Sequence, residues 1–185
     1  GTTIWSMAFA MFQMTFAIIS AAIMSGSVVE RVRFRAYCVL ISLWVLLVYV
    51  PICHWVWGSS GWLDKLGVLD FAGGTVVHVS SGTSGLVAAT MLGPRHHKLA
   101  GVARPNSVPF VLLGAALLWF GWNGFNGGSA LAANAVAARA VLATNLAAAS
   151  SMLVWVAVES ARLRQPSSVG AMVGAVAGLV VITPT

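Results

Sequence analysis

Charged residues are scarce in this chain, and acidic ones are nearly missing. Among 185 residues, 8% are charged and only four are Asp or Glu, whereas 59% are hydrophobic and the mean hydropathy is +0.91. A soluble domain of this length normally carries about 25% charged residues. The composition therefore excludes an ordinary soluble domain and indicates an integral membrane protein embedded in a lipid bilayer.

Cysteine is rarer still, and its placement excludes two kinds of site. Cys38 and Cys53 are the two cysteines, and they lie on one apolar run about four helical turns apart. That separation is too long for a disulfide between them, and neither has the spacing of a metal ligand. His96 and His97 form an adjacent pair without a third ligand at useful spacing. We expect no metal site and no cofactor.

Long polar segments are missing as well, and no linker divides the chain. Apolar runs of near 20 residues, the length that spans a bilayer, occupy 3–29, 35–57, 70–92, 107–126, 130–160 and 167–183. No alternation of period two persists, which argues against transmembrane strands. The sequence therefore predicts an all-α integral membrane protein with about six transmembrane helices in one domain, 1–185.

Basic residues recur in alternate breaks between these runs, which predicts the orientation. Eight of the ten occupy three breaks: Arg31, Arg33 and Arg35; Arg95, Lys98 and Arg104; Arg162 and Arg164. The positive-inside rule assigns these breaks to the cytoplasm, so the first run enters from outside. Because the basic residues form no single patch, nucleic-acid binding is a poor explanation of the net charge of +6.

An aspartate and a histidine mark the third run. Asp70 stands at its start and His78 lies eight residues later among apolar neighbours. A helix over this interval would carry His78 about 12 Å below Asp70, toward the middle of the bilayer. An ionisable group at that depth is costly to bury and indicates a functional site.

Glycines and aromatic residues gather at the end of the fourth run. Four glycines lie among the aromatic residues of the segment 119–129, so we expect the helix to unwind there. Rings attract cations through their π faces. Trp57, Phe16, Phe125 and the hydroxyl of Ser129 are therefore predicted to form a vestibule that recruits a cation above His78.

Three further groups of residues carry structural expectations. Gly170, Gly174 and Gly178 form a small-residue ridge on the sixth run, whose neighbours we expect among helices outside this chain. Asn134 and Asn145 are expected to form hydrogen bonds between helices. The acidic residues Glu30 and Glu159, at predicted helix ends, are expected to cap helices or to pair with arginine.

Five motifs of the chain resemble the ammonium transporter family (Amt/Mep/Rh), on its Amt/Mep branch. They are FQMTF (12–16), ERVRF (30–34), WG (57–58), DFAGGTVVH (70–78) and GWNGFNGGS (121–129). Their order and spacing agree along essentially the whole chain. The resemblance implies an eleven-helix bundle with one pore per subunit, usually trimeric, of which this chain resembles helices three to eight. The chain is then a partial transporter domain without the later helix that carries the second pore histidine.

The resemblance also implies roles for individual residues. The outer ammonium site corresponds to Trp57, Phe16 and Ser129, with Phe12 as a neighbouring vestibule ring. The stacked pore gate corresponds to Phe16 and Phe125, the first pore histidine to His78, and a structural aspartate near the site to Asp70.

The implied function is ammonium or ammonia transport across the cell membrane (plasma or inner), with methylammonium as an analogue. Ammonium recruited by the aromatic cage would lose a proton and cross the histidine-lined apolar pore as ammonia, because moving a bare ion through it is costly. The implied assembly is a homotrimer that answers to a small trimeric signalling protein at the cytoplasmic face. An ammonium sensor on the same fold is the alternative.

An enzyme is not expected. Gly82-Thr83-Ser84-Gly85 matches the G-x-S-G pattern of intramembrane serine proteases. However, no intramembrane histidine follows Ser84 to serve as its base. Small residues that allow close helix packing explain this string better.

Overall fold

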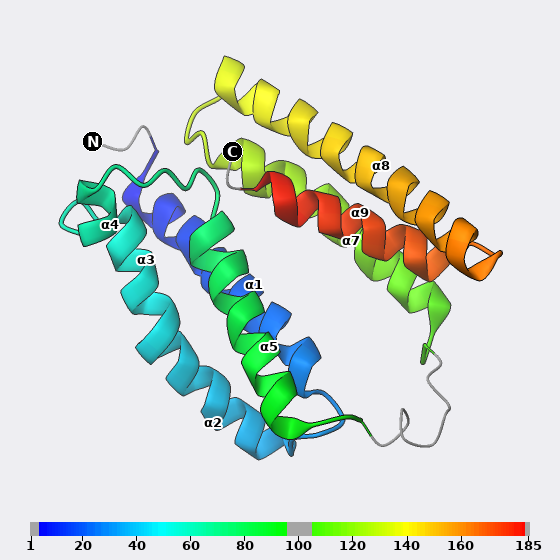
Figure 1. The fold of residues 1–185 in the computed structure, drawn as a ribbon. Helices are drawn as coiled ribbons and strands as arrows, with labels where there is room; N and C mark the ends of the chain where they lie inside the picture. The colour runs from blue at the N-terminus through cyan, green and yellow to red at the C-terminus, as the bar shows by residue number, and fades with distance from the viewer. Residues whose placement is uncertain (1–3, 96–104, 184–185) are drawn as a thin grey trace. The chain divides into compact units, whose positions relative to one another are not determined.

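The computed structural model of this chain describes residues 4–95 and 105–183, in which helices are joined by turns and no strand occurs. Its elements in order are α1 Ser6–Val28, α2 Phe34–Trp44, the π-helix η1 Val45–Tyr49, α3 Val50–Trp57 and α4 Trp62–Lys65, then the π-helix η2 Gly74–Val79, α5 Ser80–Leu92, α7 Val108–Gly128, α8 Ala135–Leu163 and α9 Ser168–Ile182 (Figure 1). His96, His97 and the basic residues Lys98 and Arg104 lie outside the described residues.

Each predicted apolar run contains a helix, and the predicted fold class is confirmed. Within the described residues, α1, the segment Phe34–Lys65, α7 and α8 are long and apolar enough to cross a membrane. The third run forms η2 and α5 in direct succession, and the sixth forms the shorter apolar helix α9.

The chain divides into two compact units, and the first comprises Trp5–Arg104. Within it α1 packs against η2 and α5, and α3 packs against η2 (Figure 1). The buried side of α1 is a stripe with one residue every four positions: Phe16, Ser20, Met24 and Val28. The indole nitrogen of Trp44 donates to the Ser84 hydroxyl at 2.9 Å and ties α2 to α5.

Arg31 joins the predicted cytoplasmic ends of two helices in this unit. Its guanidinium donates to the carbonyl oxygens of Ala89 and Gly93 at the end of α5, and to that of Ser27 in α1. The last carbonyls of a helix have few intrahelical donors, and the Ala89 oxygen also accepts from the backbone N–H of Gly93 at 3.1 Å. Arg31 therefore caps α5. Glu30, two residues after the end of α1, adopts a left-handed conformation with φ of 67°.

The second unit contains α7, α8 and α9, which pack pairwise around Trp122, Ala148 and Leu179. The glycine ridge of α9 contacts α8, so the expectation that its neighbours lie outside the chain is wrong. A Cβ atom on Gly174 would lie 2.5 Å from the Cβ of Trp155, and one on Gly178 would overlap the Ala147 carbonyl. Only glycine permits this close approach.

Polar contacts hold the starts of two helices of this unit, at the N-caps Asn134 of α8 and Ser167 of α9. The Asn134 side chain accepts from the backbone N–H groups of Val136 and Ala137, which makes it the N-cap of α8. Its predicted interhelical bond is therefore wrong. The Glu159 carboxylate accepts from the Ser167 backbone and hydroxyl, so the predicted capping role is confirmed for Glu159.

The glycine-rich end of α7 remains helical to Gly128, contrary to the predicted unwinding. Side chains from other helices anchor it. The indole of Trp122 donates to the Thr183 hydroxyl at 2.9 Å, and the amide of Asn126 donates to the Thr144 hydroxyl at 2.9 Å. Gly127 lies against Val141 with no room for a Cβ atom. Packing thus outweighs the low helix propensity of glycine.

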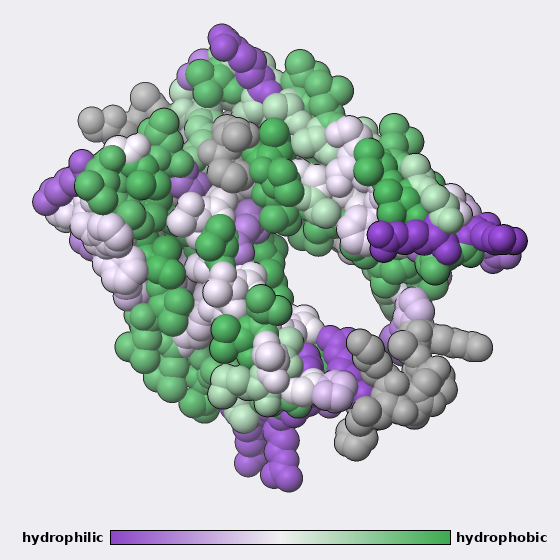
Figure 2. Space-filling view, viewed as in Figure 1, coloured by the Kyte–Doolittle hydropathy of each residue, from purple (hydrophilic) through white to green (hydrophobic). Residues whose placement is uncertain are grey.

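The sides of the helices are apolar. Leu47, Leu86 and Phe120, all within helices, are 70%, 70% and 80% exposed. Figure 2 shows hydrophobic residues covering most of the visible surface, with hydrophilic residues in separate patches. This distribution suits helices surrounded by lipid or by other transmembrane helices and would be unfavourable in water.

Candidate functional site

The Asp70 carboxylate binds the start of the helix that carries His78. One carboxylate oxygen accepts from the backbone N–H groups of Gly73 and Gly74 at 2.7 and 2.8 Å. The other accepts from those of Thr75 and Val76 at 2.8 and 3.0 Å. Four otherwise unpaired donors are thereby satisfied, and a negative charge lies at the positive end of the helix dipole.

Gly73 allows the backbone to turn from Asp70 into this helix. Its φ of 102° is in the left-handed region that favours glycine. A Cβ atom here would lie 2.8 Å from Cγ2 of Val77 and 3.4 Å from ring atoms of Phe16 and Trp57. The turn is therefore enclosed by the rings of the predicted vestibule.

Three aromatic rings meet beside this turn. Phe12 and Phe16 lie edge to face with centroids 4.8 Å apart, and Phe16 and Trp57 lie edge to face at 5.4 Å. The indole nitrogen of Trp57 donates to the backbone carbonyl of Asp70 at 2.7 Å, which fixes the orientation of the ring. Phe16 is 1% exposed and Trp57 is half-buried. The predicted rings Phe12, Phe16 and Trp57 thus form one cluster against the Asp70 turn.

His78 lies on η2, about one helical turn below the Asp70 cap, and is 9% exposed. The prediction of eight helical residues between the two is wrong. The helix begins at Gly74, because the carboxylate of Asp70 reaches back to cap it and residues 70–73 form the turn. Short π-helical segments frequently occur at functional sites.

Ser129 and Phe125 belong to the second unit, at the end of α7. The Ser129 hydroxyl donates to the Phe125 carbonyl oxygen at 2.8 Å, so the lone pairs of its own oxygen are left to accept. Phe125 packs against Trp122 with ring centroids 5.4 Å apart. The indole of Trp119 donates to Asn145, whose amide donates to Asn123 on α7, which confirms the predicted interhelical role of Asn145.

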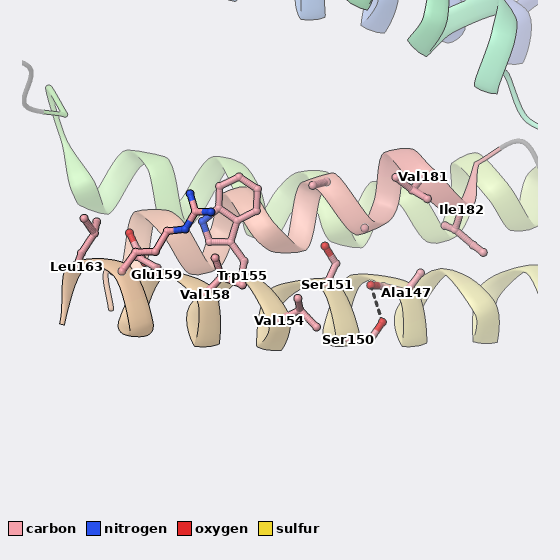
Figure 3. Close-up of a pocket in the computed structure, with 13 residues that line it drawn as sticks. Ala147, Ser150, Ser151, Val154, Trp155, Val158, Glu159, Leu163, Val181 and Ile182 are labelled. Atoms are coloured by element: carbon pink, nitrogen blue, oxygen red, sulfur yellow. Dashed lines mark hydrogen bonds between the residues drawn. The ribbon is translucent and has the colours of Figure 1, made fainter. Parts of the chain in front are cut away.

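A groove of about 820 Å³ also lies in the second unit, along α8 and α9 (Figure 3). Val154, Val158 and Val181 contribute to its mostly apolar lining, and Glu159 and Leu163 lie toward the end of α8. None of the predicted site residues lines it. The groove is therefore separate from the candidate site.

The sequence motifs name the side chains of the candidate site but do not show how its backbone is held. Gly73 was not singled out, although an aspartate followed within four residues by two glycines is a signal for a capped helix start. The fold places five predicted residues within one unit: Phe12, Phe16, Trp57, Asp70 and His78. Phe125 and Ser129 are described with the other unit. Among the described residues, no group of three or more potential metal ligands occurs.

Known proteins similar to this chain carry consistent names. An ammonium transporter of Bacillus subtilis (strain 168) is 52% identical over 176 residues, covering 95% of this chain and 43% of the relative. A crystal structure of Saccharomyces cerevisiae Mep2 superposes with a TM-score of 0.92 at 44% identity, covering 99% of this chain and 41% of that one. A structure titled "Sensor Amt Protein" gives a TM-score of 0.86 at 37% identity, covering 94% of this chain and 45% of that one.

The chain thus spans about two fifths of the length of these relatives. The family profile described as Ammonium Transporter Family matches residues 1–185. Together with the membrane-spanning helices and the ring cluster beside Asp70, these similarities establish that the chain belongs to the ammonium transporter family.

Proposed function

We propose that the full-length protein containing this chain transports ammonium or ammonia across a cell membrane, plasma or inner, as a multi-pass protein. The observation that carries the proposal is the Phe12–Phe16–Trp57 cluster beside the Asp70-capped helix of His78. The printed names of the relatives, which are ammonium transporters, support it.

Recruitment of ammonium is the first step of the proposed mechanism. The ion has four N–H donors and a positive charge, so it requires acceptors and π faces. Trp57 and Phe16 supply the faces, with Phe12 as a supporting ring, and the Ser129 oxygen supplies lone pairs. These contacts replace part of the water that the ion loses.

Passage as ammonia is the second step. An intact ion would lose most of its hydration in an apolar pore at a high free-energy cost. We assign Phe16 and Phe125 to the gate and His78 to the pore, where its imidazole hydrogen-bonds ammonia or relays the proton. Asp70 contributes by fixing the start of the His78 helix rather than by binding the ion.

The proposed partners follow from the family. We propose a homotrimer, with methylammonium as a transported analogue and a small trimeric signalling protein as a regulator at the cytoplasmic face. The basic residues Arg33 and Arg35 are exposed at that predicted face.

Uptake of methylammonium by the full-length protein, in cells without their own ammonium transporters, tests this function. We expect Trp57→Leu to raise the half-saturation concentration several-fold, because a cation–π contact contributes about 0.5–2 kcal/mol. We expect His78→Ala to change conduction. Trp62→Leu and His54→Ala, at exposed positions, are matched controls that should behave as the parent. Parent-like uptake by both site variants would contradict the assignment.

An ammonium sensor is the second candidate, supported by the similarity to the structure titled "Sensor Amt Protein". A sensor would bind ammonium without transporting it. Ammonium binding by the purified full-length protein, combined with no uptake of methylammonium, would favour this alternative over transport.

A further inference from the structure

Gln13 has a buried acceptor that the roles assigned above do not use. Its side-chain oxygen Oε1 is fully buried, yet no described residue donates a hydrogen bond to it. A buried carbonyl oxygen without a donor is costly, and most such atoms in native proteins have a partner. The position therefore requires a donor from a ligand or a neighbour.

The position of Gln13 on α1 places it on the packed side of that helix. At about 100° per residue, Gln13 lies about 20° from Ser20 and about 60° from Phe16 around the helix axis. Both of these residues are buried against the rest of the unit. By contrast, Met14 lies about 160° from Phe16 on the same projection, and it is 46% exposed.

Along the helix axis, Gln13 lies between the two rings that α1 contributes to the cluster. Phe12 precedes it directly and Phe16 follows within one turn, and these rings are 4.8 Å apart. A polar amide among apolar neighbours in a transmembrane helix has a high free-energy cost unless it forms a hydrogen bond.

We propose that Gln13 is a further specificity-determining residue, whose Oε1 accepts a hydrogen bond from an ammonium or methylammonium ion held at the Phe12–Phe16–Trp57 cluster. The inference rests on the proposed function and deepens it. The rings attract any small cation through a broad π face, whereas a carbonyl acceptor is directional. Ammonium and methylammonium both carry N–H donors, which a bare alkali ion does not.

Three variants of the full-length transporter test the role of Gln13. Gln13→Met keeps the length of the side chain and removes the acceptor. Gln13→Glu keeps both the length and an oxygen acceptor. Met14→Leu alters the adjacent, exposed position and serves as the matched control. Each variant is measured for the half-saturation concentration and maximal rate of methylammonium uptake, and for its thermal unfolding midpoint in detergent.

We expect Gln13→Met to raise the half-saturation concentration about tenfold, as the loss of one charge-assisted hydrogen bond predicts. Its maximal rate and unfolding midpoint should stay close to those of the parent. Gln13→Glu should keep a half-saturation concentration close to that of the parent, and Met14→Leu should match the parent.

Two results would overturn this role. One is a half-saturation concentration for Gln13→Met equal to that of Met14→Leu. The other is an equal rise of the half-saturation concentration in both Gln13 variants, together with a lowered unfolding midpoint. That result would indicate that Gln13 serves only to pack the helix. If the parent transports methylammonium, these results reject the role of Gln13 and leave the proposed function intact. A parent without uptake rejects the proposed function itself.

Discussion

Gly73 combines a left-handed backbone with a crowded α-carbon. Its φ is 102°, and a Cβ atom would lie 2.8 Å from Cγ2 of Val77. Gly67 offers a matched comparison in the same unit, since its φ is 79° but nothing lies within 4 Å of its Cβ position. The pair separates the cost of the backbone conformation from the cost of crowding.

We expect Gly73→Ala to lower the free energy of unfolding by about 2–4 kcal/mol in the full-length protein. About 1–2 kcal/mol comes from the left-handed conformation and about 1–3 kcal/mol from overpacking. Gly67→Ala should show only the first cost. Unfolding by titration with denaturing detergent measures both. Equal losses in the two variants would mean that the Val77 side chain yields freely to the added methyl group.

The Asp70 carboxylate holds four backbone donors with two oxygens, a task for which asparagine is unsuited. Asp70→Asn puts an amide NH₂ group against two N–H donors, which leaves these buried groups unpaired. We expect a loss of at least about 2 kcal/mol in the free energy of unfolding, together with reduced methylammonium uptake. Asp64→Asn, in the short helix α4, is the control. A parent-like stability of Asp70→Asn would show that the charge is dispensable.

At the scale of elements, hydropathy predicts each helix but not its ends. The third run begins at Asp70, yet its helix begins at Gly74 because the carboxylate folds back as a cap. The fifth run begins at 130, yet α8 begins at Ala135 because Asn134 caps it. A cap is a contact between one side chain and a few backbone N–H groups, so the hydropathy of the segment does not predict it.

The glycines of α7 and α9 show a second reason why sequence patterns are incomplete. Glycine lowers local helix propensity by about 1 kcal/mol per residue, which predicted unwinding at the end of α7. Hydrogen bonds from Trp122 to Thr183 and from Asn126 to Thr144 hold that end in place. These partners are 61 and 18 residues away in sequence, so local sequence patterns do not predict them.

Close packing of α8 on α9 depends on the glycine ridge. A Cβ atom on Gly174 would lie 2.5 Å from the Cβ of Trp155 and 3.1 Å from the Cα of Met152. We expect Gly174→Ala to force the helices apart and to lower the free energy of unfolding by about 1–3 kcal/mol. Gly121→Ala on α7, where nothing lies within 4 Å, should be neutral or stabilising. If Gly174→Ala were the more stable variant in detergent titration, the ridge would not be a packing surface.

At the scale of the whole molecule, composition and motif order predicted the membrane class and the family, and both are confirmed. The side chains of the candidate site could be named from sequence because the motifs fix their chemistry. Their arrangement could not, since it depends on contacts such as Trp57 with the Asp70 carbonyl. The roles of Phe125 and Ser129 stay predictions, as do the trimer and its regulator.

Orientation in the membrane is the remaining property that the charge pattern predicts for the whole chain. The exposed residues Ser59, between α3 and α4, and Gln165, between α8 and α9, lie in breaks assigned to opposite sides. In a full-length background with Cys38→Ala and Cys53→Ala, we expect Ser59→Cys to react with a membrane-impermeant maleimide in intact cells. Gln165→Cys should react only after permeabilisation. Both engineered thiols sit outside the helices, so their reactivity reports the side of the membrane rather than burial. The reverse pattern would place the Phe12–Phe16–Trp57 cluster at the cytoplasmic mouth and make it a site of release instead of recruitment.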